Sequence, residues 1–561
     1  MYILKNILPL NLVLSLFVTT STFAQTVQQT PSSLLNELDK PDIPVDTPLK
    51  LEFKNKNQKQ PYNADDQTIL NIQKVIIDGN SVFTDTYLAK YFQTITKGPS
   101  TVKEINQLIS ELTADYRNKG YFLASISPVI SNQNDTTTLS LRIVEGFIDE
   151  IILEPIKETI LGGPDEERIL SYARLITESH PLHIDDIERG LLLINDMPGV
   201  KVKSVIKPSP NTIGAANLHL LIEHEEFTGV LTTNNRGTKT LGRNRLHGLL
   251  SINSLTGTSN ETQIHVSTIA PINSEGKLLH LGLTHKELIG DDGLSLTVNT
   301  SGLYSEEGGN LEQYEIIGTS RSTSVSIDYP VLRTRNENLY ASAQLNYAKQ
   351  ETTLLDEPIL EDRVWSIEAS GKYELAGDGC LSRLTVGISK GLNIFDASNK
   401  NDQYLSRNKG RPDFLKTTAS FSHDQLLSQQ VVGSFKLATQ ISPHSLLSSQ
   451  EFTLGGSQYG KAYQGSSLSG DQGLATAVEF KKNYSFNTDI TLQPFTYIDG
   501  GRVWNHNDQE DGYLASTGVG LRLHYNTGAW WDISLNAPLT NKTLNDRSND
   551  LHVFFSGGIS F

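Results

Sequence analysis

The sequence predicts a mainly β protein, in which two small α+β modules precede a sixteen-stranded antiparallel transmembrane β-barrel. The first observation behind this prediction is the composition of the 561-residue chain, with 37% hydrophobic residues, 43 Gly and 20 Tyr. Adding Gly and leaving out Tyr brings the apolar fraction to about 41%, below the roughly 45–50% of soluble globular domains. A barrel explains the deficit, because only alternate residues of its strands face lipid.

An N-terminal export signal is the second observation. Lys5 precedes an apolar run over residues 7–18, and small residues lead to the cleavage that we expect between Ala24 and Gln25. Residues 1–24 therefore read as a signal peptide, since the run is too short for a membrane anchor. The sequence contains no helical span, so an embedded part must be a closed barrel. The predicted location is the outer membrane of a Gram-negative cell.

The segment between the signal peptide and the first module is polar. Residues 25–44 contain one short amphipathic helix, expected over 32–40, and residues 45–68 read as a linker. The residues that define this helix are the cap, Ser32 or Ser33, and the apolar Leu34, Leu35 and Leu38.

Two α+β modules follow, at residues 69–147 and 148–225. The first reads strand, helix, helix, strand, strand, and the second repeats this order with helices at 165–179 and 184–196. The long helix of the first module is marked by apolar residues at helical spacing, namely Val102, Ile105, Leu108, Ile109, Leu112 and Tyr116. Two modules of one design in tandem predict a binding arm rather than a catalytic domain.

Between residues 226 and 561 the helical period disappears, and this alternation is the third observation. Sixteen segments alternate apolar with polar residues, at about 21 residues for each strand with its connection, which suits a membrane-spanning barrel. The last strand, for example, carries on one face Leu551, Val553, Phe555, Ile559 and Phe561. A soluble β-sandwich or propeller is the alternative, but the signal peptide, the even strand number and the polar inward faces favour the barrel.

One connection is too long for a regular barrel. The strands expected at 432–441 and 473–482 are separated by about thirty residues, and a loop of that length is usually functional. This loop, 443–472, is rich in glycine and serine and carries a lone cation. Its motif residues are Gly455, Gly456, Gly460, Lys461, Tyr463, Ser469, Gly470 and Asp471.

The strand expected at 494–504 offers a partner for this loop. One face of it carries Phe495, Tyr497 and Asp499. A carboxylate facing lipid is costly, so this face is predicted to line the lumen. The paired Gly500 and Gly501 allow another segment to approach closely, and an aspartate shielded by that segment requires a cation such as Lys461. The alternative is that Asp499 is one of many solvated charges in the lumen.

Enzyme signatures occur only in the wrong context. Residues 455–461 spell G-x4-G-K, but Ala462 stands where Ser or Thr would bind magnesium, and no helix-forming run follows. Residues 387–391 spell G-x-S-x-G inside an alternating strand instead of at a strand-to-helix turn. The glycine-flanked pair Asp291 and Asp292 suits a hairpin turn better than a calcium site. The sequence predicts no enzyme, no cofactor and no metal site.

Charge and cysteine content exclude further classes. The formal net charge of −16 argues against nucleic acid as a partner, because phosphate binding needs a basic surface. The single cysteine, Cys380, excludes a disulfide framework and any zinc or iron–sulfur site built from cysteines.

Five segments together resemble the outer-membrane transporters of two-partner secretion (the TpsB type, haemolysin or haemagglutinin secretion/activation proteins, including the contact-dependent inhibition kind). They are 116–121 (YRNKGY) and 143–146 (IVEG) in the first module, 192–200 (LLINDMPGV) in the second, 454–473 in the long loop and 495–504 in the strand expected at 494–504. The family loop has V-R-G-F where this chain has Gly460-Lys461-Ala462-Tyr463. We therefore expect Lys461 to pair with Asp499 as a point charge, without the bidentate geometry of arginine.

The resemblance implies that the modules are periplasmic POTRA domains, that residues 32–40 plug the lumen, and that loop 443–472 folds back into the barrel. It assigns the role of a conformational lock between loop and strand to Lys461, Tyr463, Asp499, Gly500 and Gly501. The implied partner is a large secreted exoprotein of the adhesin, cytolysin or contact-dependent toxin type. A monomer embedded in outer-membrane lipid would recognise that exoprotein with its POTRA domains and pass it unfolded through the barrel without ATP.

Two other functions suit a barrel of this kind. An outer-membrane insertase would assemble barrel proteins, but the two-module arm and the N-terminal extension with its helix argue against it. A passive porin would leave the arm and the inward loop without a role.

Overall fold

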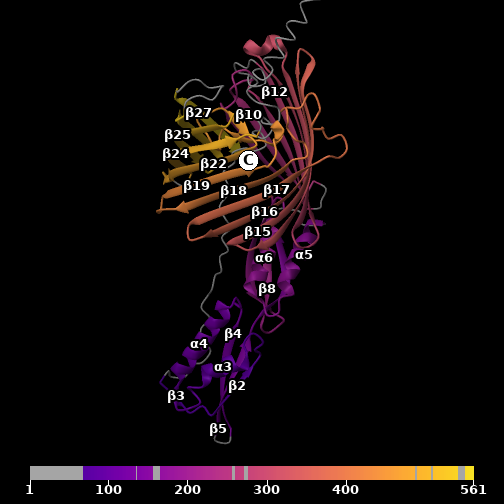
Figure 1. Ribbon diagram of the computed structural model, residues 1–561. Helices are drawn as coiled ribbons and strands as arrows, with labels where there is room; N and C mark the ends of the chain where they lie inside the picture. The colour runs from indigo at the N-terminus through magenta and orange to yellow at the C-terminus, as the bar shows by residue number, and fades with distance from the viewer. Residues whose placement is uncertain are drawn as a thin grey trace, which may run out of the picture.

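The computed structural model describes residues 67–133, 136–155, 164–255, 259–270, 276–486, 489–506, 510–540 and 550–561. The expected signal peptide, its cleavage position, the helix over 32–40 and most of the linker lie outside the described residues. Figure 1 shows two small modules in line below a large barrel. Within the described residues, no helix is both long and apolar enough to cross a membrane.

The first module has the predicted order of elements. A three-stranded sheet in the order β2-β5-β4 is packed against two helices, and β2 runs parallel to β5. The elements are β1 (Ile69–Leu70), β2 (Lys74–Asp78), α3 (Asp85–Phe92), β3 (Ser100–Thr101), α4 (Val102–Asn118), β4 (Ser125–Gln133) and β5 (Thr136–Val144). A capping box between Thr101 and Glu104 starts α4, which explains why the helix begins where it does.

Two of the motif residues in this module contact each other. The hydroxyl of Tyr116 lies 3.1 Å from Oε1 of Glu145, which also accepts the backbone N–H groups of Ser81 at 2.7 Å and Val82 at 3.0 Å. These bonds join the end of β5 to α4 and to the turn after β2. Gly146 has φ +80°, and a Cβ there would lie 2.5 Å from Leu123, so this position favours glycine.

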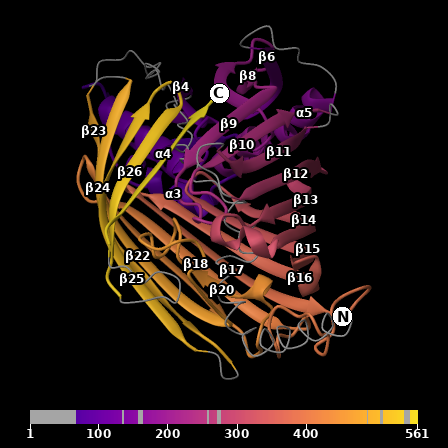
Figure 2. The same cartoon turned by 90° about the horizontal axis from the view of Figure 1, so that it is seen from above.

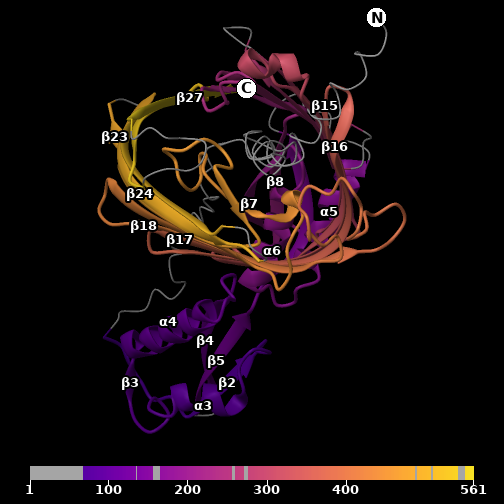
Figure 3. The ribbon, with the colours of Figure 1, turned by 45° about the horizontal axis from the view of Figure 1, so that its top comes forward.

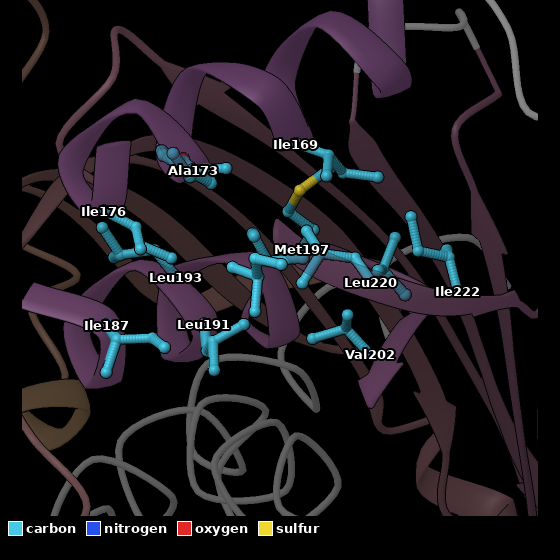
Figure 4. Packing of buried hydrophobic residues seen from close by; sticks show 14 of the residues in the cluster. Ile169, Ala173, Ile176, Ile187, Leu191, Leu193, Met197, Val202, Leu220 and Ile222 are labelled. Carbon is cyan, nitrogen blue, oxygen red and sulfur yellow. The ribbon is translucent and has the colours of Figure 1, made fainter. Parts of the chain in front are cut away.

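The second module repeats the plan with the sheet order β6-β8-β7. Its elements are β6 (Phe147–Pro155), α5 (Pro164–Thr177), α6 (Ile184–Asn195), β7 (Val200–Pro208) and β8 (Ala215–His224). Figure 4 shows Ile169 and Ile176 of α5, Leu191 of α6 and Leu220 of β8 converging on one apolar core. Burial of this face, and not helix propensity alone, holds the two helices on the sheet.

The second module is fixed to one end of the barrel. Arg333 forms a bidentate ion pair with Asp196, with both N–O distances at 2.7 Å. Arg168 donates to the carbonyl of Leu288 at 3.2 Å, and the side chain of Leu288 joins the core of the module. Bidentate pairing and shared apolar packing together set the orientation of the arm at the barrel mouth.

The barrel closes through sixteen long antiparallel strands in the described residues, together with the two-residue β23 (Tyr484–Ser485). The strands are β9 (Phe227–Asn234), β10 (Arg245–Asn253), β11 (Asn260–Ile269), β12 (Lys277–Ile289), β13 (Leu294–Glu306), β14 (Ile317–Arg333), β15 (Glu337–Leu354), β16 (Glu357–Gly377), β17 (Cys380–Leu392), β18 (Leu415–Leu426), β19 (Val431–Ile441), β22 (Gln472–Lys482), β24 (Ile490–Trp504), β25 (Gly512–Tyr525), β26 (Ala529–Pro538) and β27 (His552–Ser560). Closure is made by β27 and β9, which pair only over 556–560 and 230–234.

The barrel faces follow the predicted alternation. On β15, Leu339 and Leu345 are exposed on the outer surface, whereas the intervening Gln344 hydrogen-bonds Asn346 on the inner one. Exposed aliphatic residues repeat on the outer side of the other strands, as expected for a surface covered by lipid.

The long loop folds into the lumen. It connects β19 with β22, as predicted, and contains the short strands β20 (Phe452–Leu454) and β21 (Leu468–Gly470), which pair with each other. Figures 2 and 3, which look into the barrel, show this orange segment inside the ring of strands. Its tip and its two ends contact different parts of the barrel.

Candidate functional site

The tip of the lumen loop is a compact turn built on three glycines. Gly455, Gly456 and Gly460 all have positive φ, at +104°, +101° and +77°. A Cβ on Gly460 would lie 2.4 Å from a methyl carbon of Leu514, so only glycine fits this approach to β25. The N–H of Tyr463 donates to the carbonyl of Gly460 at 2.9 Å and closes the turn around Lys461.

Asp499 faces the lumen, as predicted. It is 4% exposed, whereas its neighbour Ile498 is 55% exposed on the outer side of β24. Phe495 and Tyr497 share the inner face and are buried. Arg502 lies on the outer face near the end of the strand, 3.6 Å from Asp511.

The loop tip reaches Asp499 through its backbone. The N–H of Lys461 donates to Oδ2 of Asp499 at 3.1 Å, and the hydroxyl of Ser516 donates to the other carboxylate oxygen. The expected pairing of the Lys461 ammonium with Asp499 is wrong: Nζ lies 3.0 Å from Oε2 of Glu479. Both oxygens of Asp499 already accept hydrogen bonds, and the long lysine stem carries the ammonium across the ring of Tyr497, at 4.4 Å, toward Glu479.

Glu479 is the centre of a charge network that the motifs do not reveal. Arg522 donates to Oε1 of Glu479 at 2.7 Å and to Asp532 at 2.9 Å, so the loop tip is tied to β22, β25 and β26. In the register of β22 with β24, Glu479 stands opposite Tyr497. Its place in the alternation of inward- and outward-facing residues along β22 is the one sequence signal that could have assigned Glu479 to the lumen.

Tyr463 and the paired glycines complete the contact between loop and barrel. The hydroxyl of Tyr463 lies 2.7 Å from Oγ1 of Thr540 and 3.1 Å from the carbonyl of Ala515. A Cβ on Gly501 would meet the side chain of Leu454 at 2.7 Å, so this glycine allows the loop to approach. A Cβ on Gly500 would instead meet the backbone of the adjacent β25.

Two further residues hold the tip from the strands that close the barrel. Arg236, just after β9, donates to the carbonyl of Lys461 at 3.2 Å and packs over the ring of Phe554 at 4.1 Å. His552, at the start of β27, lies 2.7 Å from the carbonyl of Ala462. Neither residue belongs to a recognisable motif, because each is placed by strand closure across most of the chain.

Ser469, Gly470 and Asp471 lie at the other end of the loop. Ser469 donates to Glu451 at 3.1 Å, and Asp471 is completely buried beside Arg407. The predicted residues therefore divide into two sites, one at the tip and one at the base of the loop.

The rejected enzyme signatures have non-catalytic positions. Residues 455–461 form the lumen turn, residues 387–391 lie within β17, and Asp291 and Asp292 lie in the hairpin between β12 and β13. Among the described residues, no group of three or more His, Cys, Asp or Glu is arranged to hold a metal ion.

A barrel with a lumen loop and a two-module arm can now be compared with known proteins. The sequence profile of the haemolysin secretion/activation protein family ShlB/FhaC/HecB matches residues 219–523, more than half of the chain. The chain belongs to this family. The POTRA profile, described as a surface antigen variable number repeat, matches residues 70–146.

This transporter is similar to known proteins over most of its length. The heme/hemopexin transporter protein HuxB of Haemophilus influenzae is 24% identical, with 96% of each chain covered. The outer membrane transporter CdiB of Dickeya dadantii is 25% identical over 74% of this chain and 73% of its own. The solved structure of CdiB from Escherichia coli has a TM-score of 0.71 at 16% identity and covers 97% of this chain and 98% of its own.

Membership confirms the resemblance seen in the motifs. The protein is an outer-membrane transporter of two-partner secretion that exports exoproteins, its POTRA domains lie in the periplasm, and it is not an enzyme. The fold of BamA from Haemophilus ducreyi, without its first three POTRA domains, is also similar, at a TM-score of 0.51 and 12% identity over 88% of this chain and all of that one.

Proposed function

We propose that this transporter recognises its exoprotein by adding an extended segment of that protein to the free edge of β2, in the first POTRA domain. In the sheet order β2-β5-β4, β2 pairs with β5 on one side only. Strand addition supplies affinity through main-chain hydrogen bonds and makes little demand on the sequence of the partner.

A groove beside β2 carries this proposal. It has a volume of about 660 Å³ and lies between β2 and α3, where it is lined by Val75, Ile77, Leu88, Ala89 and Phe92. A strand added at the edge would place alternate side chains over these apolar residues. The groove thus supports recognition of an extended, partly apolar segment.

The other edges of the two three-stranded sheets, formed by β4, β6 and β7, are less suited to strand addition. Proline, a bulge and charged side chains all discourage pairing at an edge. Pro128 lies in β4, and the register of β6 shifts between Ile148 and Glu150. β7 carries along its exposed side Lys201, Lys203 and Lys207 and ends at Pro208.

The same proposal gives the lumen loop the role of a lock. The loop tip fills part of the path that an unfolded chain would take. Passage therefore requires release of the contacts of Lys461 with Asp499 and Glu479, and of the contacts of Tyr463 with Thr540 and Ala515. The partner would move without ATP, and its folding outside the cell would oppose its return. Residues 32–40 stay a predicted plug, and deletion of 25–40 is expected to raise ion conductance across planar bilayers.

The cargo proposed is a large secreted protein. The relatives support this class, because HuxB is named a heme/hemopexin transporter and covers 96% of both chains. An exoprotein of that haem-related type, an adhesin, a cytolysin and a contact-dependent toxin all suit an edge-strand recognition mode. The open reading frame next to the gene of this transporter identifies the candidate exoprotein. Co-expression of that exoprotein with this chain tests whether it is secreted.

The decisive experiment fills the groove without disturbing the core. Ala89 is exposed on α3 and lines the groove, so Ala89→Trp should reduce secretion of the co-expressed exoprotein by at least about fivefold, since blocking an interface anchor costs more than about 1 kcal/mol. Ala114→Trp, on the exposed face of α4, is the matched control and should secrete normally. Equal secretion by both variants would contradict the proposal, and loss of other barrel proteins on depletion would favour an insertase.

A further inference from the structure

The base of the lumen loop is held by one buried arginine from a different loop. Arg407 lies between β17 and β18, and its side chain is 8% exposed. Its guanidinium donates to Oδ1 of Asp471 at 2.5 Å and lies 2.9 Å from Oε1 of Glu451. Glu451 immediately precedes β20 and Asp471 immediately follows β21. The Arg407 side chain therefore binds both ends of the segment that contains these two strands.

Asp471 and Arg407 also form hydrogen bonds with neighbouring segments. Besides Arg407, it accepts the N–H of Leu446 at 2.6 Å and the N–H of His506 at 2.8 Å. Arg407 also donates to the carbonyl of Leu446 at 2.8 Å and to Asn505 at 3.0 Å. The connection after β24, which holds Asn505 and His506, is thereby joined to the same point.

The tip and the base differ in how strongly they are held. At the tip the Lys461 ammonium makes one ion pair, and Glu479 keeps Arg522 as a partner if the lysine leaves. At the base, removal of Arg407 would leave two buried carboxylates and a backbone carbonyl without their cation, which is far more costly. Loss of the Arg407 ion pairs is therefore costlier than loss of the Lys461 ion pair.

We infer that Arg407 and Asp471 are positioning residues that form a fixed pivot for loop 443–472, so that the tip is released for transport while the base stays closed. This inference rests on the proposed role of the loop as a lock. It assigns a purpose to the S-G-D motif, which the contact between tip and barrel leaves unexplained.

Hydrogen exchange of the full mature chain in detergent micelles tests the pivot without any cargo. Lys461→Met should speed exchange in a peptide over 458–463 and leave 443–451 unchanged. Arg407→Met and the isosteric Asp471→Asn should speed exchange over 443–451, on the order of a hundredfold, because they break a buried ion pair. Arg411→Met, in the same loop and paired with Asp413 in a more exposed ion pair, is the matched control and should not.

Two disulfides, one at the base and one at the tip, test the consequence. Ser448 donates its N–H to Oγ of Ser406 at 3.0 Å in the base, and Ala462 donates its N–H to Oγ of Ser516 at 3.3 Å at the tip. In a Cys380→Ser background, the tip pair A462C/S516C should abolish large-conductance openings in KCl until it is reduced. The base pair S406C/S448C should leave their frequency within about twofold of the reduced protein, because the base stays closed while the tip is released.

Either assay can overturn the inference. It fails if Arg407→Met exchanges like Arg411→Met, if Lys461→Met also opens the base, if the base disulfide blocks openings, or if the tip disulfide leaves them intact. Recognition of the exoprotein at β2 is tested separately by secretion of the Ala89 variant, so its failure is distinguishable from failure of the pivot. Should a disulfide not form, the exchange comparison with Asp471→Asn still decides.

Discussion

In the second POTRA domain, Leu218 and Leu220 point from β8 into an aliphatic core, whereas Leu339 and Leu345 point outward from β15 of the barrel. Leu218 is 0% exposed and Leu345 is 39% exposed, although both are leucines in β-strands. The solvent around each domain explains the difference: water surrounds the arm, and lipid surrounds the barrel. An outward leucine is therefore a normal feature of the barrel, and the interior of the barrel is free for polar contacts.

The largest expected effect comes from removing a leucine from each region. Leu218→Ala should destabilise the second POTRA domain by about 2–5 kcal/mol, because it leaves a cavity in a packed core. The matched Leu345→Ala removes the same atoms from a lipid-facing position and should cost far less. Urea-dependent proteolysis of the full chain in lipid vesicles measures both, and similar losses would contradict the inside-out arrangement.

A charge on either face of one strand sharpens the comparison. Leu345→Arg places a cation in lipid and should cost about 2–4 kcal/mol, depending on depth. Gln344→Arg places the same cation in the lumen one residue away and should leave folding nearly unchanged. The fraction of heat-modifiable, folded barrel in electrophoresis distinguishes them, and equal folding would show that Leu345 does not face lipid.

Polar contacts provide the third comparison. Lys461→Met removes one ion pair from the barrel interior while Glu479 keeps Arg522, so we expect about tenfold more frequent openings in planar bilayers, or about 1.4 kcal/mol. Lys119→Met removes an ammonium 4.2 Å from the ring of Phe83 on the arm, where an exposed cation–π contact contributes only about 0.5–1 kcal/mol. That variant should open like the parent, and equal effects of the two would mean that the tip is not a lock.

A pH dependence is also expected at the base of the loop. Burial raises the pKa of Glu451 to about 7. The positive charge of Arg407 opposes this shift and the negative charge of Asp471 adds to it, and Ser469 and Asp362 also face the carboxyl group. The closed base binds this proton more tightly than an opened base with an ordinary glutamate, so its stability should fall as pH rises from about 4.5 to about 7.

Hydrogen exchange over 443–451, corrected for the intrinsic rate, measures this dependence. Glu451→Gln cannot titrate and should give a base whose opening is independent of pH in that interval. A parent protein with the same flat profile would contradict the raised pKa of Glu451.

Regular patterns predicted most of the fold. Helical spacing located α4 and α6, and alternation located β15, β24 and the strands around the lumen loop. The capping box at Thr101 is a local feature that is formed within four consecutive residues. Such features are readable because neighbours in sequence decide them.

The candidate site was predicted in part. The face of Asp499, the turn at Gly460 and the approach of the loop at Gly501 follow from local rules on alternation and on glycine. The ion-pair partner of Lys461 could not be predicted, since the register of β22 against β24 brings Glu479 within 3.0 Å of it. Arg407 lies in an irregular connection with no motif, so nothing local connects it with Asp471.

The sequence by itself determined the two-module arm, the alternating strands and the long loop, because each depends on the order and period of nearby residues. Only the tertiary structure decided which charges meet. Lys461 and Glu479, Arg407 and Asp471, and Arg236 and the loop tip are brought together by barrel closure and by an inward fold of the chain. Electrostatic contacts in a closed barrel depend on register and distance in space, and these are properties of the whole ring of strands.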